Sequence, residues 1–323
     1  MNIREYKVSN VSFIEIKGKE FVVTLSSLGA SIYEIKCGED YLSLTPESYG
    51  DFFKPNIYHG KTIGPVANRI KNSETKIGDK LYKFEPNENG NLLHSGLKGL
   101  SNQLFDYEIS SLNKDLLVKY TYFARDFVDG FPGNRTFNIT YKIRENSALE
   151  IDLKFDVISD EESLFRLTNH SYFSLGEKSI GNLTLLLRSK KYILPSAKDL
   201  TLIREEKMID SLDYNKAQKL QKSLSDSELI NSNTKGIDHF FYFDGAKKLS
   251  LSSEKYRLDI KTDFEGVQLY SDGHEDETTY KGTKAKKFRG LAVEPGDSHL
   301  YNVPSKEYHR YISYKFTKNL FIK

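Results

Sequence analysis

The feature that most constrains this chain is a strict two-residue alternation of apolar and charged side chains at residues 147–158. In this stretch, SALEIDLKFDVI, apolar residues occupy every second position from Leu149 to Val157, and acids or a lysine stand between them. Successive side chains of a β-strand point to opposite faces, so one face of the segment meets a core and the other meets water. The alternation predicts a half-buried antiparallel strand.

The same period recurs at residues 137–143, 256–260 and 312–316. The sequence DGFPGN at residues 129–134 precedes the first of these runs, and its glycines, proline and asparagine are typical of a tight loop. No long helical patterns alternate with the strands. The chain is therefore expected to form a large all-β sandwich or barrel and not a βαβ fold.

One long segment, residues 196–230, interrupts this pattern. It is polar and rich in Lys, Ser and Asp, with a weak helical spacing of Leu202, Ile203, Met208 and Ile209. We expect a long excursion with one or two helical turns, not a linker between domains. Because large β-sandwiches reach this size as single units, the 323 residues predict one domain over positions 1–323.

Composition excludes several classes of protein. The chain is 38% hydrophobic and 13% aromatic, which is enough to bury a sizeable core. Its 47 basic and 45 acidic residues leave a formal charge of +2, so neither a nucleic acid nor a membrane is expected as a partner. Cys37 is the single cysteine, and the N-terminal MNIREYKVSN lacks the apolar core of a secretory signal. A cytoplasmic location is therefore expected.

Three patterns imitate functional motifs. His59-Gly60-Lys61-Thr62 ends like a phosphate-binding loop, but Pro55 stands where that motif needs glycine. The basic run at 284–289 is interpreted as a solvated loop. The seven histidines form neither an HxH nor an HExxH pattern, so no metal site is predicted. They are His59, His94, His170, His239, His274, His299 and His309.

Polar groups also stand among apolar or small residues in ANRI at 67–70, NLLHSG at 91–96 and GLAVEPG at 290–296. A lone histidine such as His94 or His170 is more often a hydrogen-bonded structural residue than a catalyst. Pairing with an acid explains Arg69 equally well. Spacing alone does not bring these residues together.

Taken together, however, the blocks resemble the aldose 1-epimerase, or galactose mutarotase, family. They follow the family's order and cover most of the chain: GPVANRI (64–70), NLLHSG (91–96), DGFPGN (129–134), TNHSYFSL (168–175), GIDHFF (236–241), GVQLYSDG (266–273) and LAVEPG (291–296). The resemblance implies an all-β fold, a large antiparallel β-supersandwich of the galactose mutarotase type with the sugar in an open cleft. This agrees with the strands expected from the alternation.

The resemblance also implies a role for each matching residue. Glu294 would be the general base and His170 the general acid, while His94 would assist beside the ring oxygen. Four residues would hold sugar hydroxyls: Asn68, Arg69, Asp238 and Gln268.

The implied reaction explains these residue types. To interconvert the α and β anomers of a free aldohexose such as galactose or glucose, one group removes the proton of the anomeric hydroxyl while another protonates the ring oxygen. We expect a protonated His170 and an ionised Glu294 on opposite sides of the ring to perform both transfers. No cofactor is needed, and the partner is a small-molecule sugar. Tyr172 and Phe173 carry aromatic faces suited to stacking on the sugar, but core packing is favoured for both.

Several departures from the family pattern leave alternatives open. Ser95 replaces a second glycine, Leu104 or Phe105 stands near a usual tryptophan, and the segment 296–299 lacks the glutamine and the proline-aspartate expected after the base. A hexose-6-phosphate 1-epimerase is therefore an alternative, although Arg69 is the only phosphate-binding group that the sequence nominates. A non-catalytic carbohydrate-binding protein on the same fold is another.

Overall fold

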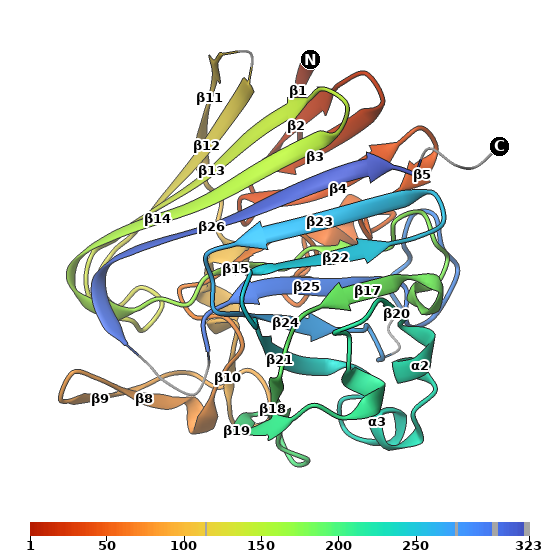
Figure 1. The fold of residues 1–323 in the computed structure, drawn as a ribbon. Helices are drawn as coiled ribbons and strands as arrows, with labels where there is room; N and C mark the ends of the chain where they lie inside the picture. The colour runs from red at the N-terminus through yellow and green to blue at the C-terminus, as the bar shows by residue number, and fades with distance from the viewer. Residues whose placement is uncertain (114, 275–276, 299–302, 320–323) are drawn as a thin grey trace.

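The computed structural model describes residues 1–113, 115–274, 277–298 and 303–319, and the regular secondary structure within them is mostly antiparallel β-sheet. The expected all-β class is confirmed (Figure 1). The largest sheet has nine strands. In spatial order they are β11 (Asp106–Leu112), β12 (Asp115–Ala124), β13 (Arg135–Glu145), β14 (Leu149–Leu164), β26 (Pro304–Lys318), β23 (Tyr256–Thr262), β22 (Lys248–Ser252), β17 (Thr184–Leu187) and β20 (Gln218–Lys219).

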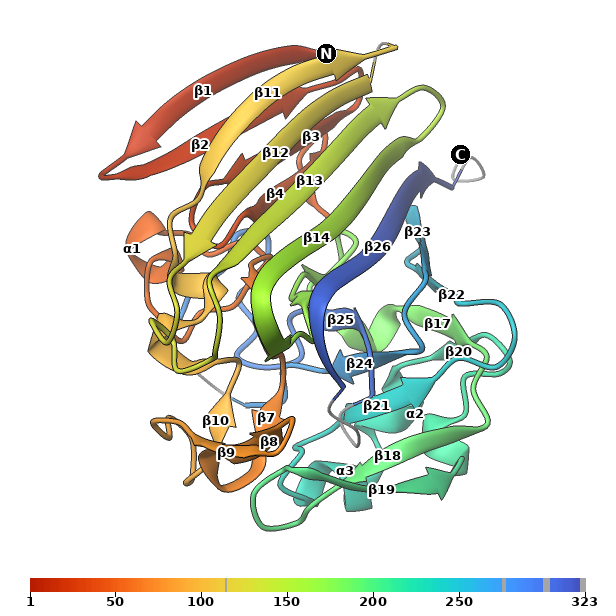
Figure 2. The ribbon, with the colours of Figure 1, turned by 90° about the vertical axis from the view of Figure 1, so that its left-hand side faces the viewer.

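Two smaller sheets pack with the large one (Figure 2). The five-stranded sheet contains β1 (Asn2–Val8), β2 (Val11–Lys17), β3 (Phe21–Ser26), β4 (Ser31–Cys37) and β5 (Asp40–Tyr41). The six-stranded sheet runs in the order β16 (Tyr172–Phe173), β25 (Leu291–Gly296), β24 (Gly266–Tyr270), β21 (Asp238–Tyr242), β18 (Lys191–Pro195) and β19 (Leu202–Lys207).

Short elements complete the described part of the chain. The strand pairs are β6 (Thr62–Ile63) with β15 (Thr168–Asn169), β7 (Arg69–Ile70) with β10 (Leu92–Leu93), and β8 (Glu74–Ile77) with β9 (Lys80–Lys83). The α-helices are α1 (Tyr49–Phe52), α2 (Gln221–Leu224) and α3 (Ser227–Asn231). Single 3₁₀ turns lie at Lys71–Ser73, Gly96–Lys98, Leu100–Asn102, Ile180–Asn182 and Asp210–Leu212. No helix of the described residues is long and apolar enough to cross a membrane.

The alternation in the sequence is the alternation of burial in the sheet. Along β14 the side chains from Leu149 to Val157 are buried at every second position, and Phe137 lies opposite Val157 in the neighbouring strand. The predicted strands at 147–158, 137–143, 256–260 and 312–316 are confirmed as β14, β13, β23 and β26. One apolar cluster reaches from Ile14 to Phe316 and joins all three large sheets, which supports our proposal of a single domain.

The segment 196–230 is organised differently from the expectation. Leu202 and Ile203, whose spacing hinted at a helix, belong to strand β19, which pairs with β18 at the edge of the six-stranded sheet. The expected helical turns occur later, as α2 and α3. The weak helical spacing at residues 202–209 does not mark these turns, because pairing with a neighbouring strand overrides a weak local spacing.

Candidate active site

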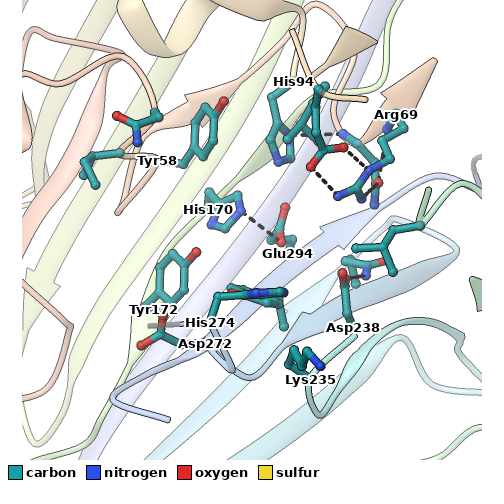
Figure 3. Close-up of a pocket in the computed structure, with 18 of the residues that line it drawn as sticks. Tyr58, Arg69, His94, His170, Tyr172, Lys235, Asp238, Asp272, His274 and Glu294 are labelled. Atoms are coloured by element: carbon teal, nitrogen blue, oxygen red, sulfur yellow. Dashed lines mark hydrogen bonds and ion pairs between the residues drawn. The ribbon is translucent and has the colours of Figure 1, made fainter. Parts of the chain in front are cut away.

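A cavity of about 760 Å³ lies over the six-stranded sheet and the short strand pairs beside it (Figure 3). Every residue for which the family resemblance implied a role contributes to its lining. These residues are Asn68, Arg69, His94, His170, Asp238, Gln268 and Glu294. Segments distant in the sequence therefore converge on one site, which spacing alone did not show.

Neighbouring strands of the six-stranded sheet carry the acidic side of the cavity. Glu294 on β25 stands directly opposite Gln268 on β24, so both side chains leave the same face of the sheet. Gln268 in turn donates from Nε2 to Oδ1 of Asp238 on β21, at 2.6 Å. Burial raises the pKa of Asp238, and the positive charge of Arg69 opposes that shift.

His170 lies in the turn between β15 and β16 and is held through its backbone. Its N–H donates to the carbonyl of Lys61, and its own carbonyl accepts the N–H of Gly60, both at 2.9 Å. The side chain of Asn169 also donates to the carbonyl of Gly60. The HGKT stretch that imitated a phosphate-binding loop is therefore the segment that positions this histidine.

The imidazole of His170 and the carboxyl of Glu294 lie side by side. Nε2 of His170 is 3.3 Å from Oε1 of Glu294, and both side chains are almost fully buried. No pyranose fits into that gap, so the expectation that the two groups face each other from opposite sides of the ring is wrong. A ligand that contacts both groups has to approach them from the cavity.

Burial governs the charge of this pair. It lowers the pKa of His170 to about 4. It raises the pKa of Glu294 well above the ordinary value, with the negative charge of Asp238 adding to the rise and Arg69 opposing it. Burial therefore disfavours the charged form of both groups, the imidazolium of His170 and the carboxylate of Glu294.

His94 reaches the cavity from an unusual backbone conformation. His94 and Ser95 have φ angles of 52° and 62°, in the left-handed region. Nδ1 of His94 accepts the N–H of Asn68 at 3.1 Å, so the proton of the neutral ring lies on Nε2. Ser95, which replaces a glycine of the family, bonds both the N–H and the carbonyl of Val66. These two bonds help hold the left-handed turn without glycine.

Arg69 is bound by an acid that the sequence did not identify. Glu88 accepts two hydrogen bonds from its guanidinium, at 2.5 Å to Nε and 2.8 Å to Nη2. Burial is the largest single influence on the pKa of Arg69 and lowers it, but the hydrogen bond to Glu88 and the nearby carboxylates together raise it above its ordinary value. The two residues are brought together by a chain reversal through β8 and β9, which no local pattern reveals. The only available signal was the general need of a half-buried guanidinium for a carboxylate.

The remaining sequence interpretations are resolved by burial. Phe173 is part of the core, as expected, and Tyr172 is buried against the ring of His170, 5.0 Å between centroids. Neither Leu104 nor Phe105 is among the described residues that line the cavity. In the basic run at 284–289 the lysines are exposed, but Arg289 is buried.

The family's pattern after the base falls partly on described residues. Asp297 accepts hydrogen bonds from Arg310 and Tyr308, outside the cavity, while His299 lies beyond the residues that the structure describes. In the described part of the chain, no group of three or more His, Cys, Asp and Glu side chains is arranged to hold a metal ion.

Comparison with solved structures identifies the class of fold. A galactose 1-epimerase from Lactobacillus acidophilus superposes with a TM-score of 0.86 over 98% of both chains, at 22% identity. An aldose epimerase homologue from C. elegans gives a TM-score of 0.82 over 95% of this chain and 99% of the other, at 24% identity. The fold is that of the galactose mutarotase-like proteins.

The chain belongs to the aldose 1-epimerase family, an isomerase family, whose model matches residues 12–300. The aldose 1-epimerase of Streptococcus thermophilus is 29% identical over 260 residues, which are 76% of this chain and 72% of that protein. The galactose mutarotase of Homo sapiens is 27% identical over 256 residues, 75% and 71% of the two chains. The resemblance first seen in separate sequence blocks is confirmed.

Proposed function

We propose that this protein is an aldose 1-epimerase that interconverts the α and β anomers of a free aldohexose such as galactose or glucose. The observation that carries the proposal is the contact of His170 with Glu294 at 3.3 Å, on the wall of a cavity large enough for a sugar. The anomeric oxygen and the ring oxygen of a pyranose are bonded to the same carbon. An acid and a base that touch each other therefore reach both oxygens from one side of the sugar.

The reaction needs two proton transfers in each direction. The carboxylate of Glu294 takes the proton of the anomeric hydroxyl while the imidazolium of His170 protonates the ring oxygen. The bond from C1 to the ring oxygen breaks, and the aldehyde forms. Rotation about the C1–C2 bond then presents the other face of the aldehyde, and the same transfers run backwards to close the ring.

The pair holds one proton in both halves of this cycle. In the closed-ring complex the proton is on His170, and in the aldehyde complex it is on Glu294. Burial favours the second arrangement, because it disfavours the charge on each of the two groups. Hydrogen bonds from the sugar offset the cost of the ion pair in the first. A second proton on the pair would leave no base, so acid is expected to inhibit the reaction.

The other side chains are proposed to hold the hydroxyls. Asp238 and the carbonyl oxygen of Gln268 accept, while Arg69 donates from a guanidinium that Glu88 has already oriented. Oε1 of Gln268 is buried without a hydrogen-bond partner among the described residues, which suits an acceptor kept for a ligand. Nε2 of His94 carries the donor that faces the ring oxygen in this arrangement.

Glu294→Gln tests the proposal. The amide keeps the shape of the carboxyl but cannot take a proton, so the rate of anomer exchange is expected to fall by at least about 10³. The rate is measured by polarimetry on freshly dissolved pure anomers, and circular dichroism confirms that the variant is folded. An unchanged rate refutes the assignment of Glu294. Sugar binding by calorimetry without exchange in the unmodified protein would favour a pure binding role.

Three lysines favour a hexose 6-phosphate as a second candidate substrate. Lys54, Lys198 and Lys235 line the same cavity and add to Arg69 the basic groups that the sequence did not nominate. The ammonium group of a lysine is a compact positive charge and would attract a phosphate. The rates on glucose and on glucose 6-phosphate decide between the two, because a phosphate site raises kcat/KM selectively for the phosphorylated sugar.

A further inference from the structure

The proposed acid, His170, lacks the hydrogen bond that commonly orients a catalytic histidine. Nε2 has a polar neighbour, the carboxyl of Glu294. Nδ1 is buried and has no hydrogen-bond partner among the residues that the structure describes. Histidines that transfer protons are usually fixed in orientation and tautomer by a bond at the second nitrogen. Another interaction has to set the plane of this ring.

Two tyrosine rings supply that interaction. The ring of Tyr172 stacks on the imidazole with centroids 5.0 Å apart, and the ring of Tyr58 stacks on it at 5.8 Å. The angle between planes is 28° in both cases. Figure 3 shows His170 between the two tyrosines, with its edge toward Glu294. Rotation of the imidazole about its Cβ bond would drive it into one of these faces.

The stack continues behind Tyr172 into the protein. His59 packs on Tyr172 with centroids 4.1 Å apart and planes at 19°, and Tyr280 packs on His59 at 4.9 Å. The guanidinium of Arg289 lies 4.5 Å from the centre of the Tyr280 ring and is held by a buried ion pair with Asp272, at 2.6 Å. The ring of Tyr172 is thus supported from behind by His59 and Tyr280. The ion pair of Arg289 with Asp272 fixes the far end of this row.

We propose that Tyr58 and Tyr172 are positioning residues that hold the imidazole of His170 edge-on to Glu294 and stabilise its protonated form. This inference rests on the proposed function. The faces of tyrosine rings carry negative charge density, so they attract an imidazolium placed over them. Because His170 is almost fully buried, this attraction compensates in part for the burial, which disfavours the charge.

Leucine and phenylalanine variants separate stacking from simple packing. Tyr172→Leu and Tyr58→Leu keep an apolar side chain but remove the face, and kcat is expected to fall about tenfold with KM changed less than about twofold. The acid limb of the rate profile should move to lower pH by up to about one unit. Tyr172→Phe and Tyr58→Phe keep the face and should recover most of the loss.

The pH profile is interpreted with the charged and titratable groups that surround His170. These are Glu294 on β25, His94 after β10, His59 and Tyr58 before β6, and Tyr172 on β16. None of the substitutions adds or removes a charge at neutral pH. A shift of the acid limb of the rate profile in the leucine variants is therefore caused by the loss of the aromatic ring faces that stack on His170.

Phe264→Leu is the matched control for a lost buried ring. Phe264 is fully buried and packs on Phe155, away from the cavity. Phe264→Leu should lower the melting temperature of the protein without moving the acid limb of the rate profile. If Tyr172→Leu does not fold, Tyr58→Leu carries the test, because Tyr58 is only half-buried. Unchanged kcat and acid limb in the folded leucine variants would overturn the proposal, as would phenylalanine variants as impaired as leucine.

A readout without turnover distinguishes failure of this inference from failure of the proposed function. Stacked rings shift the ring-proton NMR resonances of His170 upfield, and each leucine substitution should move them downfield. If the unmodified protein exchanges no anomers, the proposed function fails while the NMR shift still tests the stack. If exchange is present but the resonances do not move, the stacking inference fails alone.

Discussion

The two sides of the cavity are built in different ways. Glu294, Gln268 and Asp238 stand on adjacent strands, and the register of the sheet alone places them together. The opposite side consists of irregular segments, where Asn68 and His94 have left-handed φ angles of 61° and 52° and His170 lies in a turn. The proposed base, Glu294, is therefore positioned by the regular register of the sheet, and the proposed acid, His170, by individual contacts between loops.

This difference teaches where the site is vulnerable. On the strand side, a side chain is positioned by many ladder bonds that each tolerate change. On the loop side, a few backbone hydrogen bonds and Gly60 hold His170, the proposed acid. Buried polar atoms without hydrogen-bond partners among the described residues also occur on this side. His59 and Lys61 both have buried nitrogens without a hydrogen-bond partner in the described part of the chain. Strain and unpaired polar groups of this kind are tolerated where they serve function.

The largest expected effect is that of Gly60→Ala on the loop side. Gly60 has a φ of 69°, and an added Cβ would overlap the backbone carbonyl oxygen of Ile32. Because the clash is with backbone, we expect a loss of more than about 4 kcal/mol of stability, or displacement of His170 with loss of exchange activity. Urea unfolding and polarimetry measure the two outcomes.

Gly78→Ala is the matched control for that substitution. Gly78 has a similar φ of 58°, but its Cβ would meet no atom within 4 Å. It should cost only about 1 kcal/mol, the price of the left-handed conformation. If Gly60→Ala and Gly78→Ala behave alike, the close contact of Gly60 with Ile32 does not help to position His170. That result would contradict the difference proposed between the two sides of the cavity.

Lys61→Met should raise stability, because the acid side carries a buried amine. Lys61 is fully buried, its Nζ has no hydrogen-bond partner among the described residues, and it lies 4.9 Å from the centre of the Phe52 ring. Burial lowers the pKa of Lys61 to about 7 from 10.5. Between pH 7 and pH 10.5, the amine of Lys61 is therefore protonated in the unfolded chain but neutral in the folded one. Proton uptake by the unfolded chain thus disfavours folding.

The gain from Lys61→Met depends on pH. It should be largest, on the order of 3 kcal/mol, at and below pH 7 and should decline toward pH 10.5, where the amine is neutral in both states. Thermal unfolding from pH 6 to pH 10 measures it. Lys83→Met, at a side chain that is 75% exposed, is the control and should change stability by less than about 0.5 kcal/mol. A gain independent of pH would show that packing, not charge, is responsible.

The smallest effect is expected where a loop side chain has a dedicated partner. Glu88→Gln leaves Arg69 without its bidentate carboxylate, so KM for the sugar should rise about tenfold with little change in kcat. Glu74→Gln removes an acid from an exposed pair with Lys83, 3.8 Å apart, and should leave KM unchanged. A fall of kcat with constant KM in Glu88→Gln would move Arg69 from substrate holding to the reaction itself.

The positions of the strands could be predicted from the sequence where one face of the strand is exposed to solvent and the other is buried. The segments of β13, β14, β23 and β26 alternate because one side packs on the core. Their spatial order was not predictable, since β26, near the C-terminus, lies between β14 and β23. The edge strand β19 was missed because its partner β18 supplies the ladder that its own polar sequence does not indicate.

The candidate site was predictable only through the family resemblance. Glu294 looks like any acid in a strand, and its proximity to His170 follows from pairing of β16 with β25. Glu88, Tyr58 and Lys61 were missed, because their importance depends on contacts between loops. The expected separation of acid and base across the ring was wrong since it started from the substrate, not from the turn that carries His170.

Exchange spectroscopy of an equilibrium mixture of galactose anomers tests the central claim most directly. With the unmodified protein, NMR cross-peaks between the α and β anomeric protons should grow in proportion to protein concentration, and they should vanish with either His170→Asn or Glu294→Gln. Cross-peaks that persist in both variants would show that the proton shuttle lies elsewhere in the molecule.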